Sequence, residues 1–145
     1  MCLVRPMPLA ILARRLRWIM LATIAIDLLL TLHGQPRSYW HDPATALEPN
    51  PPVRYLMHMG LLPFLVAVVL YCGVAFAVVS LLPSWIGYVT ALVFSCGHFY
   101  AGSTWLEARM GLGMMGVYAY AVPLALAIGL CSAIDRSNRT SATDP

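Results

Sequence analysis

The sequence contains no lysine, and charged side chains make up only 10% of its 145 residues. Its nine basic residues are all arginines, and most of them lie near the ends of apolar stretches. This distribution argues against the broad basic patch that nucleic-acid-binding proteins use, so no nucleic-acid partner is expected. The four cysteines form no CxxC pair, and neither an HExxH nor a GxSxG motif occurs. No short motif therefore assigns a reaction.

Apolar residues dominate what is present. They make up 60% of the chain, and the mean hydropathy is +0.74, which is more apolar than a soluble domain of this size. A helix that crosses a bilayer needs about 20 mainly apolar residues. The sequence predicts one all-α membrane domain over residues 1–145, a bundle of four transmembrane helices. The four expected spans are 16–33, 55–82, 85–106 and 111–134. An outer loop is expected over 34–54 and a disordered tail over 135–145.

Proline marks three places in this scheme. Five prolines fall within 34–54, which favours a stiff, extended loop over a regular helix. Pro63 predicts a kink near the start of the second span, and Pro123 lies near the middle of the fourth.

Arginine counting predicts the orientation. Six arginines lie on the side that holds both chain ends, and three, Arg37, Arg54 and Arg109, lie on the opposite side. Because cytoplasmic segments carry the excess of positive charge, both termini are expected in the cytoplasm and the loop 34–54 outside. The expected location is the inner membrane of a prokaryote.

The rare polar residues gather in the outer half of this layout. Asp27 lies six residues before His33, and His98 lies seven before Trp105, so both sit about 9 to 10 Å below the outer surface. An ionisable group at such a depth costs about 2.5 to 3.5 kcal/mol unless it faces the bundle interior and finds a partner. We expect Asp27 and His98 to face inward, toward each other.

Two interpretations of this polar group stay open. In the structural one, Asp27, Thr31, Ser95 and His98 hold helices together through hydrogen bonds of about 1 kcal/mol each. In the functional one, Asp27 and His98 handle protons or bind a ligand in a site that opens outward. Gly97 and Ala101 form a small-xxx-small pair, which predicts that the third span approaches a neighbour closely there.

The loop adds further candidates. A rigid turn at Glu48-Pro49-Asn50-Pro51 would lower Glu48 and Asn50 over the bundle opening, although Asn-Pro also favours a plain surface turn. His58 opens the second span between Met57 and Met59, and thioether and imidazole are ligands that suit copper, whereas histidine with carboxylate suits zinc. The metal candidates are His58, His98, Met57 and Met59, but methionine in a membrane helix is commonly a packing residue.

Asp27-Leu-Leu-Leu-Thr31, followed by Glu48-Pro49-Asn50-Pro51, resembles a family of small prokaryotic multi-span membrane proteins of unknown function. In that family an Asp-x-x-x-Thr at the end of the first span precedes a Glu-x-Asn-Pro before the second. The resemblance covers residues 18–80. It implies that Asp27, Thr31, Glu48 and Asn50 form a shared polar set, and it implies no activity.

Two functions are compatible with these features. The first is a non-enzymatic accessory or ligand- or lipid-binding bundle with an outward-facing polar mouth, in which Asp27, Thr31, Glu48, Asn50, His58 and His98 contact the ligand. The second is a membrane-embedded hydrolase or metal-dependent enzyme that uses Asp27, Glu48 and His98 for acid–base chemistry. Lipid is the expected surrounding, with copies of the chain or a larger membrane complex as further partners.

Overall fold

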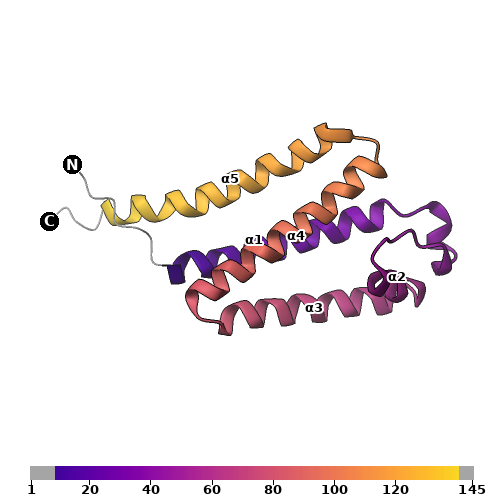
Figure 1. Cartoon of the computed structure of the whole chain (residues 1–145), viewed down its shortest axis with the longest axis horizontal. Coiled ribbons are helices and arrows are strands. Elements are labelled where there is room, and N and C mark those ends of the chain that lie inside the picture. Colours follow the sequence, from indigo (N-terminus) through magenta and orange to yellow (C-terminus); the bar gives the residue numbers. More distant parts are fainter. Residues whose placement is uncertain (1–8, 141–145) are drawn as a thin grey trace.

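The computed structural model describes the backbone of residues 9–140 and the side chains of residues 11–129, and all its regular structure is helical. Four long helices lie along the longest axis of the molecule and alternate in direction (Figure 1). They are α1 (Leu9–His33), α3 (Leu61–Leu81), α4 (Ser84–Ala108) and α5 (Gly113–Thr140). Two 3₁₀ turns, η1 (Arg37–Trp40) and η2 (Pro43–Thr45), and the short helix α2 (Pro51–His58) connect α1 to α3. We call the end of the molecule that holds these three elements the loop end.

Helix α1 packs against α3, α4 and α5, and its contact with α4 is the most extensive in the molecule. The main core cluster is apolar and joins three helices. Its buried members are Leu16, Ile19, Met20, Ile24, Ala75, Val79 and Ala91. Small residues on α4 allow the close approach, since Ala91 is fully buried and a Cβ added at Gly102 would lie 3.6 Å from Cα of Asp27.

The second predicted span is two helices. Residues 55–82 were expected to form one helix, but α2 ends at His58 and α3 begins at Leu61. Gly60 between them has a φ of 110°. Glycine adopts this conformation without steric cost, and it interrupts the α-helix. Pro63 lies in the first turn of α3, where its missing N–H is not needed, so it starts a helix and does not kink one.

The loop contains more helix than its proline content predicted. Pro51 and Pro52 occupy the first two positions of α2, where the fixed φ of proline suits a helix start. Asp42 caps η2 by accepting a hydrogen bond of 3.0 Å from the backbone N–H of Ala44. A second apolar cluster, formed by Tyr39, Ala46, Met57 and Phe64, attaches these turns to α3.

The predicted tail overlaps a helix. Residues 135–145 were expected to be disordered, but α5 continues to Thr140, and residues 141–145 lie outside the described part. Extending an existing helix adds one hydrogen bond for each residue that is fixed, which makes continuation beyond Ile134 inexpensive. Pro123 lies inside α5, as expected.

Within the described residues, two segments are long and apolar enough to cross a membrane, Ile11–His33 and Leu61–Leu81. The apolar part of α5 is shorter, Gly113–Gly129. Helix α4 carries Ser, Thr and Gly residues together with His98, which lowers its hydropathy despite its 25 residues. The structure is thus all-helical with two candidate membrane spans.

Candidate functional site

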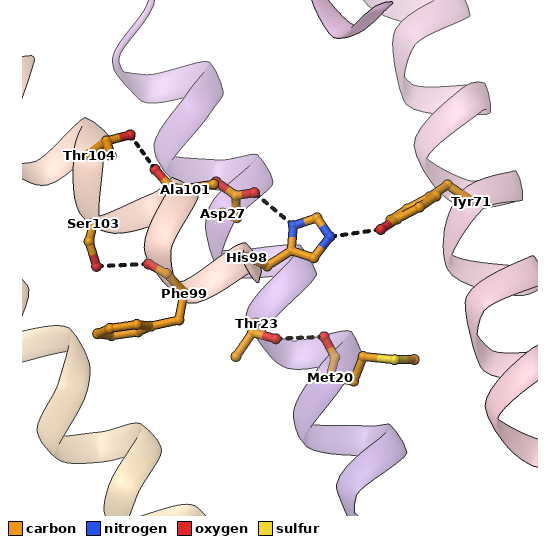
Figure 2. Close-up of polar contacts among 9 residues, drawn as sticks. All are labelled: Met20, Thr23, Asp27, Tyr71, His98, Phe99, Ala101, Ser103 and Thr104. Carbon is orange, nitrogen blue, oxygen red and sulfur yellow. Dashed lines mark hydrogen bonds and ion pairs between the residues drawn. The ribbon is translucent and has the colours of Figure 1, made fainter. Parts of the chain in front are cut away.

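Asp27 and His98 meet between α1 and α4. The carboxylate Oδ2 of Asp27 lies 2.8 Å from Nδ1 of His98, and the two side chains are 14% and 22% exposed (Figure 2). The expectation that these residues face each other is confirmed. Their contact depends on Gly102, one helical turn after His98, because a side chain there would meet Asp27, Leu30 and Tyr120. Pairing offsets the cost of burying both groups.

Tyr71 of α3 completes a chain of three side chains. Its hydroxyl oxygen lies 2.9 Å from Nε2 of His98, on the far side of the imidazole from Asp27 (Figure 2). Because the Asp27 carboxylate only accepts, Nδ1 of His98 carries a proton and donates it. When the imidazole is neutral, the Tyr71 hydroxyl donates to Nε2. When it is protonated, Nε2 donates to the Tyr71 oxygen, so a rotation of the hydroxyl accommodates both states.

These three residues line a cavity of about 540 Å³, which we call the central cavity. It lies between α1, α3 and α4, beneath the segment from Glu48 to Val53. Thr31, Glu48 and Asn50 also line it, together with the aromatic residues Phe94, Tyr100 and Trp105. The four residues of the resemblance, Asp27, Thr31, Glu48 and Asn50, therefore share one cavity.

Two smaller cavities share walls with the central one. The apolar branch, of about 310 Å³, extends between α1 and α3 along Leu28, Phe64 and Val68 and also contacts Asp27 and His98. The arginine pocket, of about 350 Å³, lies beside Trp105 and contacts Arg54 and Arg109. The central cavity shares Asp27 and His98 with the apolar branch, and Glu48 and Trp105 with the arginine pocket, so it lies between the two.

Glu48 is held over the central cavity by the loop. Its side chain is 8% exposed, and Oε1 accepts a hydrogen bond of 2.9 Å from the backbone N–H of Asn50. Burial raises the pKa of Glu48, and the negative charge of Asp27 adds to this rise. The hydrogen bond from Asn50 and the charge of Arg54 act in the opposite direction.

Gln35 positions the loop above the site. Its Nε2 donates to the carbonyl of Thr31 at 3.1 Å, and its Oε1 accepts from the backbone N–H of Leu47 at 2.8 Å. The loop is therefore tied to the end of α1 immediately before Glu48. Gly34 allows the ring of Trp105 to pack against this junction, since a Cβ at Gly34 would overlap the ring.

Other predicted site residues lie elsewhere. His58 and Met59 are exposed, Met57 is buried in the apolar cluster with Tyr39 and Phe64, and none of the three lines the central cavity. In the described part of the chain, no three His, Cys, Asp or Glu side chains come together as metal ligands. The copper or zinc set of His58, His98, Met57 and Met59 is thus not assembled there.

Two features of α4 differ from expectation. Ser95 donates to the carbonyl of Ala91 in its own helix at 2.7 Å, so this hydroxyl does not join two helices. Gly97 does not mark the close approach, because a Cβ placed there meets no atom within 4 Å. The close approach is at Gly102, and Gly97 contributes open space to the central cavity instead.

Sequence reasoning missed Tyr71 and Gln35. Tyr71 lies in an apolar run, and its one sequence signal is a hydroxyl in a helix that otherwise holds few polar groups. Gln35 follows Gly34 directly after α1. Its hydrogen-bond partner Leu47 comes close only when the loop is folded, so the sequence gives no signal for it.

No protein-family model matches the chain, and no curated protein and no solved structure matches it. The site is therefore interpreted from its own geometry, and the family resemblance of the Asp27 and Glu48 motifs stays a prediction.

Proposed function

We propose that the protein is a four-span membrane protein of a prokaryotic inner membrane, with both termini in the cytoplasm, that binds a small amphipathic molecule in the central cavity. The observation that carries the proposal is the convergence of Asp27, Glu48 and His98 on a single cavity that shares Asp27, Thr31 and His98 with the apolar branch. Amphipathic molecules match a cavity with one polar and one apolar end.

The distribution of side chains supports a lipid surrounding. On α4 the buried residues are mostly small or polar, whereas large apolar side chains are exposed. The buried small or polar ones are Gly87, Ala91, Ser95, Gly102 and Ser103, and the exposed large ones are Trp85, Val89, Val93 and Tyr100. Only 17% of the apolar stretch of α3 is buried, which is less than expected for the core helix of a water-soluble domain and favours contact with lipid.

The lengths of α4 and α5 support four spans. Their 25 and 28 residues correspond to about 38 and 42 Å, enough for a hydrocarbon layer about 30 Å thick. Helix α4 packs against both α1 and α3, the two helices that pass the length and hydropathy criteria, and α5 packs against α1 and α4.

Cysteine labelling tests this topology. In a variant whose four native cysteines are replaced, Ser38→Cys places a thiol in the loop, and Ser84→Cys places one at the first residue of α4, beside the turn from α3. We expect an impermeant maleimide to label position 38 in intact cells and position 84 only after the membrane is permeabilised. Labelling of both positions from the same side would reject the four-span arrangement.

A cavity-filling variant tests ligand binding. Gly97→Leu places a large side chain in the central cavity at a position where a Cβ meets no atom within 4 Å. The matched control is Gly73→Leu on α3, which is equally free of contacts and does not line the cavity. We expect mass spectrometry of gently purified protein to find a bound molecule in the wild type and in Gly73→Leu, but not in Gly97→Leu. Equal retention by all three proteins would contradict the proposal.

Acid–base catalysis is a second candidate, because Asp27, His98 and Glu48 contact the same cavity. An aspartate that orients a histidine is the arrangement of many hydrolases. In this structure Nε2 of His98, which would receive a proton, faces Tyr71 at 2.9 Å. Turnover of lipid esters by the wild type, abolished in Asp27→Asn with the fold intact, would favour this function over binding alone.

A further inference from the structure

We propose that the molecule bound in the central cavity is a single-chain amphiphile with a primary ammonium group, an alkylamine in its simplest form. The ammonium lies in the central cavity near Asp27, Thr31 and Glu48, and the alkyl chain lies in the apolar branch. This proposal rests on the proposed function and specifies the chemistry of its ligand.

The order of the cavities fits a ligand with two parts. The central cavity and the apolar branch lie side by side and share the lining residues Asp27, Thr31, Asn50, Val53, Tyr71 and His98. The arginine pocket shares residues with the central cavity but none with the apolar branch. A molecule that occupies the central cavity and the branch therefore has a polar group joined directly to an apolar chain.

Two carboxylates make the central cavity acidic. Asp27 and Glu48 line it, and no arginine does. Glu48 is only 8% exposed, and within the described residues its one hydrogen bond is the one that Oε1 accepts from Asn50, so Oε2 has no donor. After burial, the charge of Asp27 is a further cause that raises the pKa of Glu48, which shows that the two carboxylates repel each other. A bound cation would replace this repulsion with two attractions.

Two uncharged acceptors lie at the junction of the central cavity and the apolar branch. Thr31 is 6% exposed, and its hydroxyl has no hydrogen-bond partner in the part of the chain that the structure describes. Asn50 precedes α2 without capping it, because Pro51 and Pro52 offer no N–H group. Both side chains line both cavities instead. Since buried polar groups are normally paired, these acceptors favour a ligand that donates several hydrogen bonds.

Among polar groups, a primary ammonium fits these acceptors best. It donates three hydrogen bonds and carries a positive charge, whereas a quaternary ammonium has no N–H group and a hydroxyl has no charge. A carboxylate or phosphate would be repelled by Asp27 and Glu48. The aromatic walls at Phe94 and Tyr100 are compatible with any ammonium.

The apolar branch suits the alkyl chain. Leu28, Leu56, Phe64 and Val68 line its volume of about 310 Å³, so a chain there contacts apolar side chains of α1, α2 and α3. The opposite orientation, with the ammonium in the arginine pocket, would place it beside two guanidinium groups. A phospholipid does not fit this order either, because its phosphate, between the ammonium and the chains, would lie beside Asp27.

Binding of eight-carbon probes to the purified full-length protein in detergent tests the proposal. Octylamine, octyltrimethylammonium, octanol and octanoate are compared by native mass spectrometry at neutral pH, where the amine is protonated. We expect octylamine to bind most tightly. Loss of a hydrogen bond to a charged group should weaken its binding about tenfold in Glu48→Gln, and the binding of octanol should change less. Glu107→Gln, which removes an exposed carboxylate outside the three cavities, is the matched control.

A second variant tests the position of the chain. Ala67→Phe places a ring in the apolar branch and should weaken the binding of octylamine and octanol alike. The matched control is Ala77→Phe, at an exposed position of the same helix that lines none of the three cavities. Gly97→Leu, which fills the central cavity, should bind none of the four probes.

The possible failures are distinguishable. Equal binding of the four probes, or tightest binding of a probe other than octylamine, with loss in Gly97→Leu, would refute the primary ammonium and leave the cavity as a binding site. Octylamine binding that is unchanged in Ala67→Phe or in Glu48→Gln would refute the placement of the chain or of the ammonium. Binding that is the same in Gly97→Leu as in the wild type would refute the proposed function as well.

Discussion

His98 links Asp27 of α1 to Tyr71 of α3, with 2.8 Å from Nδ1 to the carboxylate and 2.9 Å from Nε2 to the hydroxyl oxygen. One imidazole thus bridges three helices at the wall of the central cavity. The pair with Asp27 joins residues 71 positions apart in sequence, so it forms only when α1 and α4 are packed.

A double-mutant cycle measures how strongly Asp27 and His98 are coupled. Asp27→Leu or His98→Phe alone leaves a buried polar group without its partner and should lower the free energy of unfolding by about 1 to 3 kcal/mol. The double variant should lose less than the sum, with a coupling energy of about 0.5 to 3 kcal/mol. The measurement is unfolding in mixed detergents. Additive losses would show that the two groups do not stabilise each other, and Asp42→Asn combined with His98→Phe is the additive control.

Tyr71→Phe tests the second hydrogen bond of His98. It removes the hydroxyl but keeps the ring, which also packs edge-on against the imidazole at 5.7 Å between centroids. We expect a loss of about 0.5 to 1.5 kcal/mol in the free energy of unfolding and a changed ¹⁵N shift at Nε2 of His98. Tyr55→Phe, at an exposed position of α2, should change neither. An unchanged Nε2 shift in Tyr71→Phe would contradict the contact.

Gly102 and Gly97 provide a matched test of helix packing on α4. A Cβ at Gly102 would lie 3.1 Å from Cε1 of Tyr120 and 3.2 Å from Cδ1 of Leu30, whereas a Cβ at Gly97 meets nothing within 4 Å. Gly102→Val should therefore lower the free energy of unfolding by about 1 to 3 kcal/mol more than Gly97→Val does. Equal effects would mean that α1 and α4 do not approach at Gly102.

Glu48 predicts a pH dependence of stability. Its pKa in the folded protein is raised above 4.5, chiefly by burial, so the folded state holds this proton more tightly than the unfolded state. The free energy of unfolding should therefore fall as the pH rises from about 4.5 through the folded pKa. Below 4.5 the stability contributed by this proton should be fully present, and Glu48 should add no slope. Glu48→Gln should remove this part of the slope. A wild-type slope that persists unchanged in Glu48→Gln would assign it to another group, and Glu107→Gln serves as the exposed control.

The sequence predicts the helices and the Asp27–His98 pair for the same physical reason. Apolar runs of this length must be covered by lipid or by a core, which predicts the helices. Two ionisable groups at the same depth must be shielded from apolar surroundings, which predicts that they pair with each other. The partner Tyr71 is a different case, because it depends on the rotation of α3 against α4. That rotation follows from side-chain packing between helices, which one sequence does not show.

Local breaks were harder to predict than the long helices. The boundary at Gly60 depends on a positive φ, and a single glycine between apolar residues is equally compatible with a continuous helix. The pair Gly97 and Ala101 has the spacing of a helix contact, but the contact is at Gly102. The spacing of small residues indicates that a helix can approach a neighbour, and the register of the two helices decides where.

The accessibility and charge of the central cavity are tested most directly at Ala101, which lines it. In a cysteine-free background, Ala101→Cys is treated from outside with a cationic methanethiosulfonate and with its anionic analogue. We predict that the cationic reagent reacts faster and that Glu48→Gln reduces its advantage, because two carboxylates attract cations into the cavity. Absence of reaction with both reagents, or faster reaction with the anionic one, would contradict an acidic cavity that is accessible from outside.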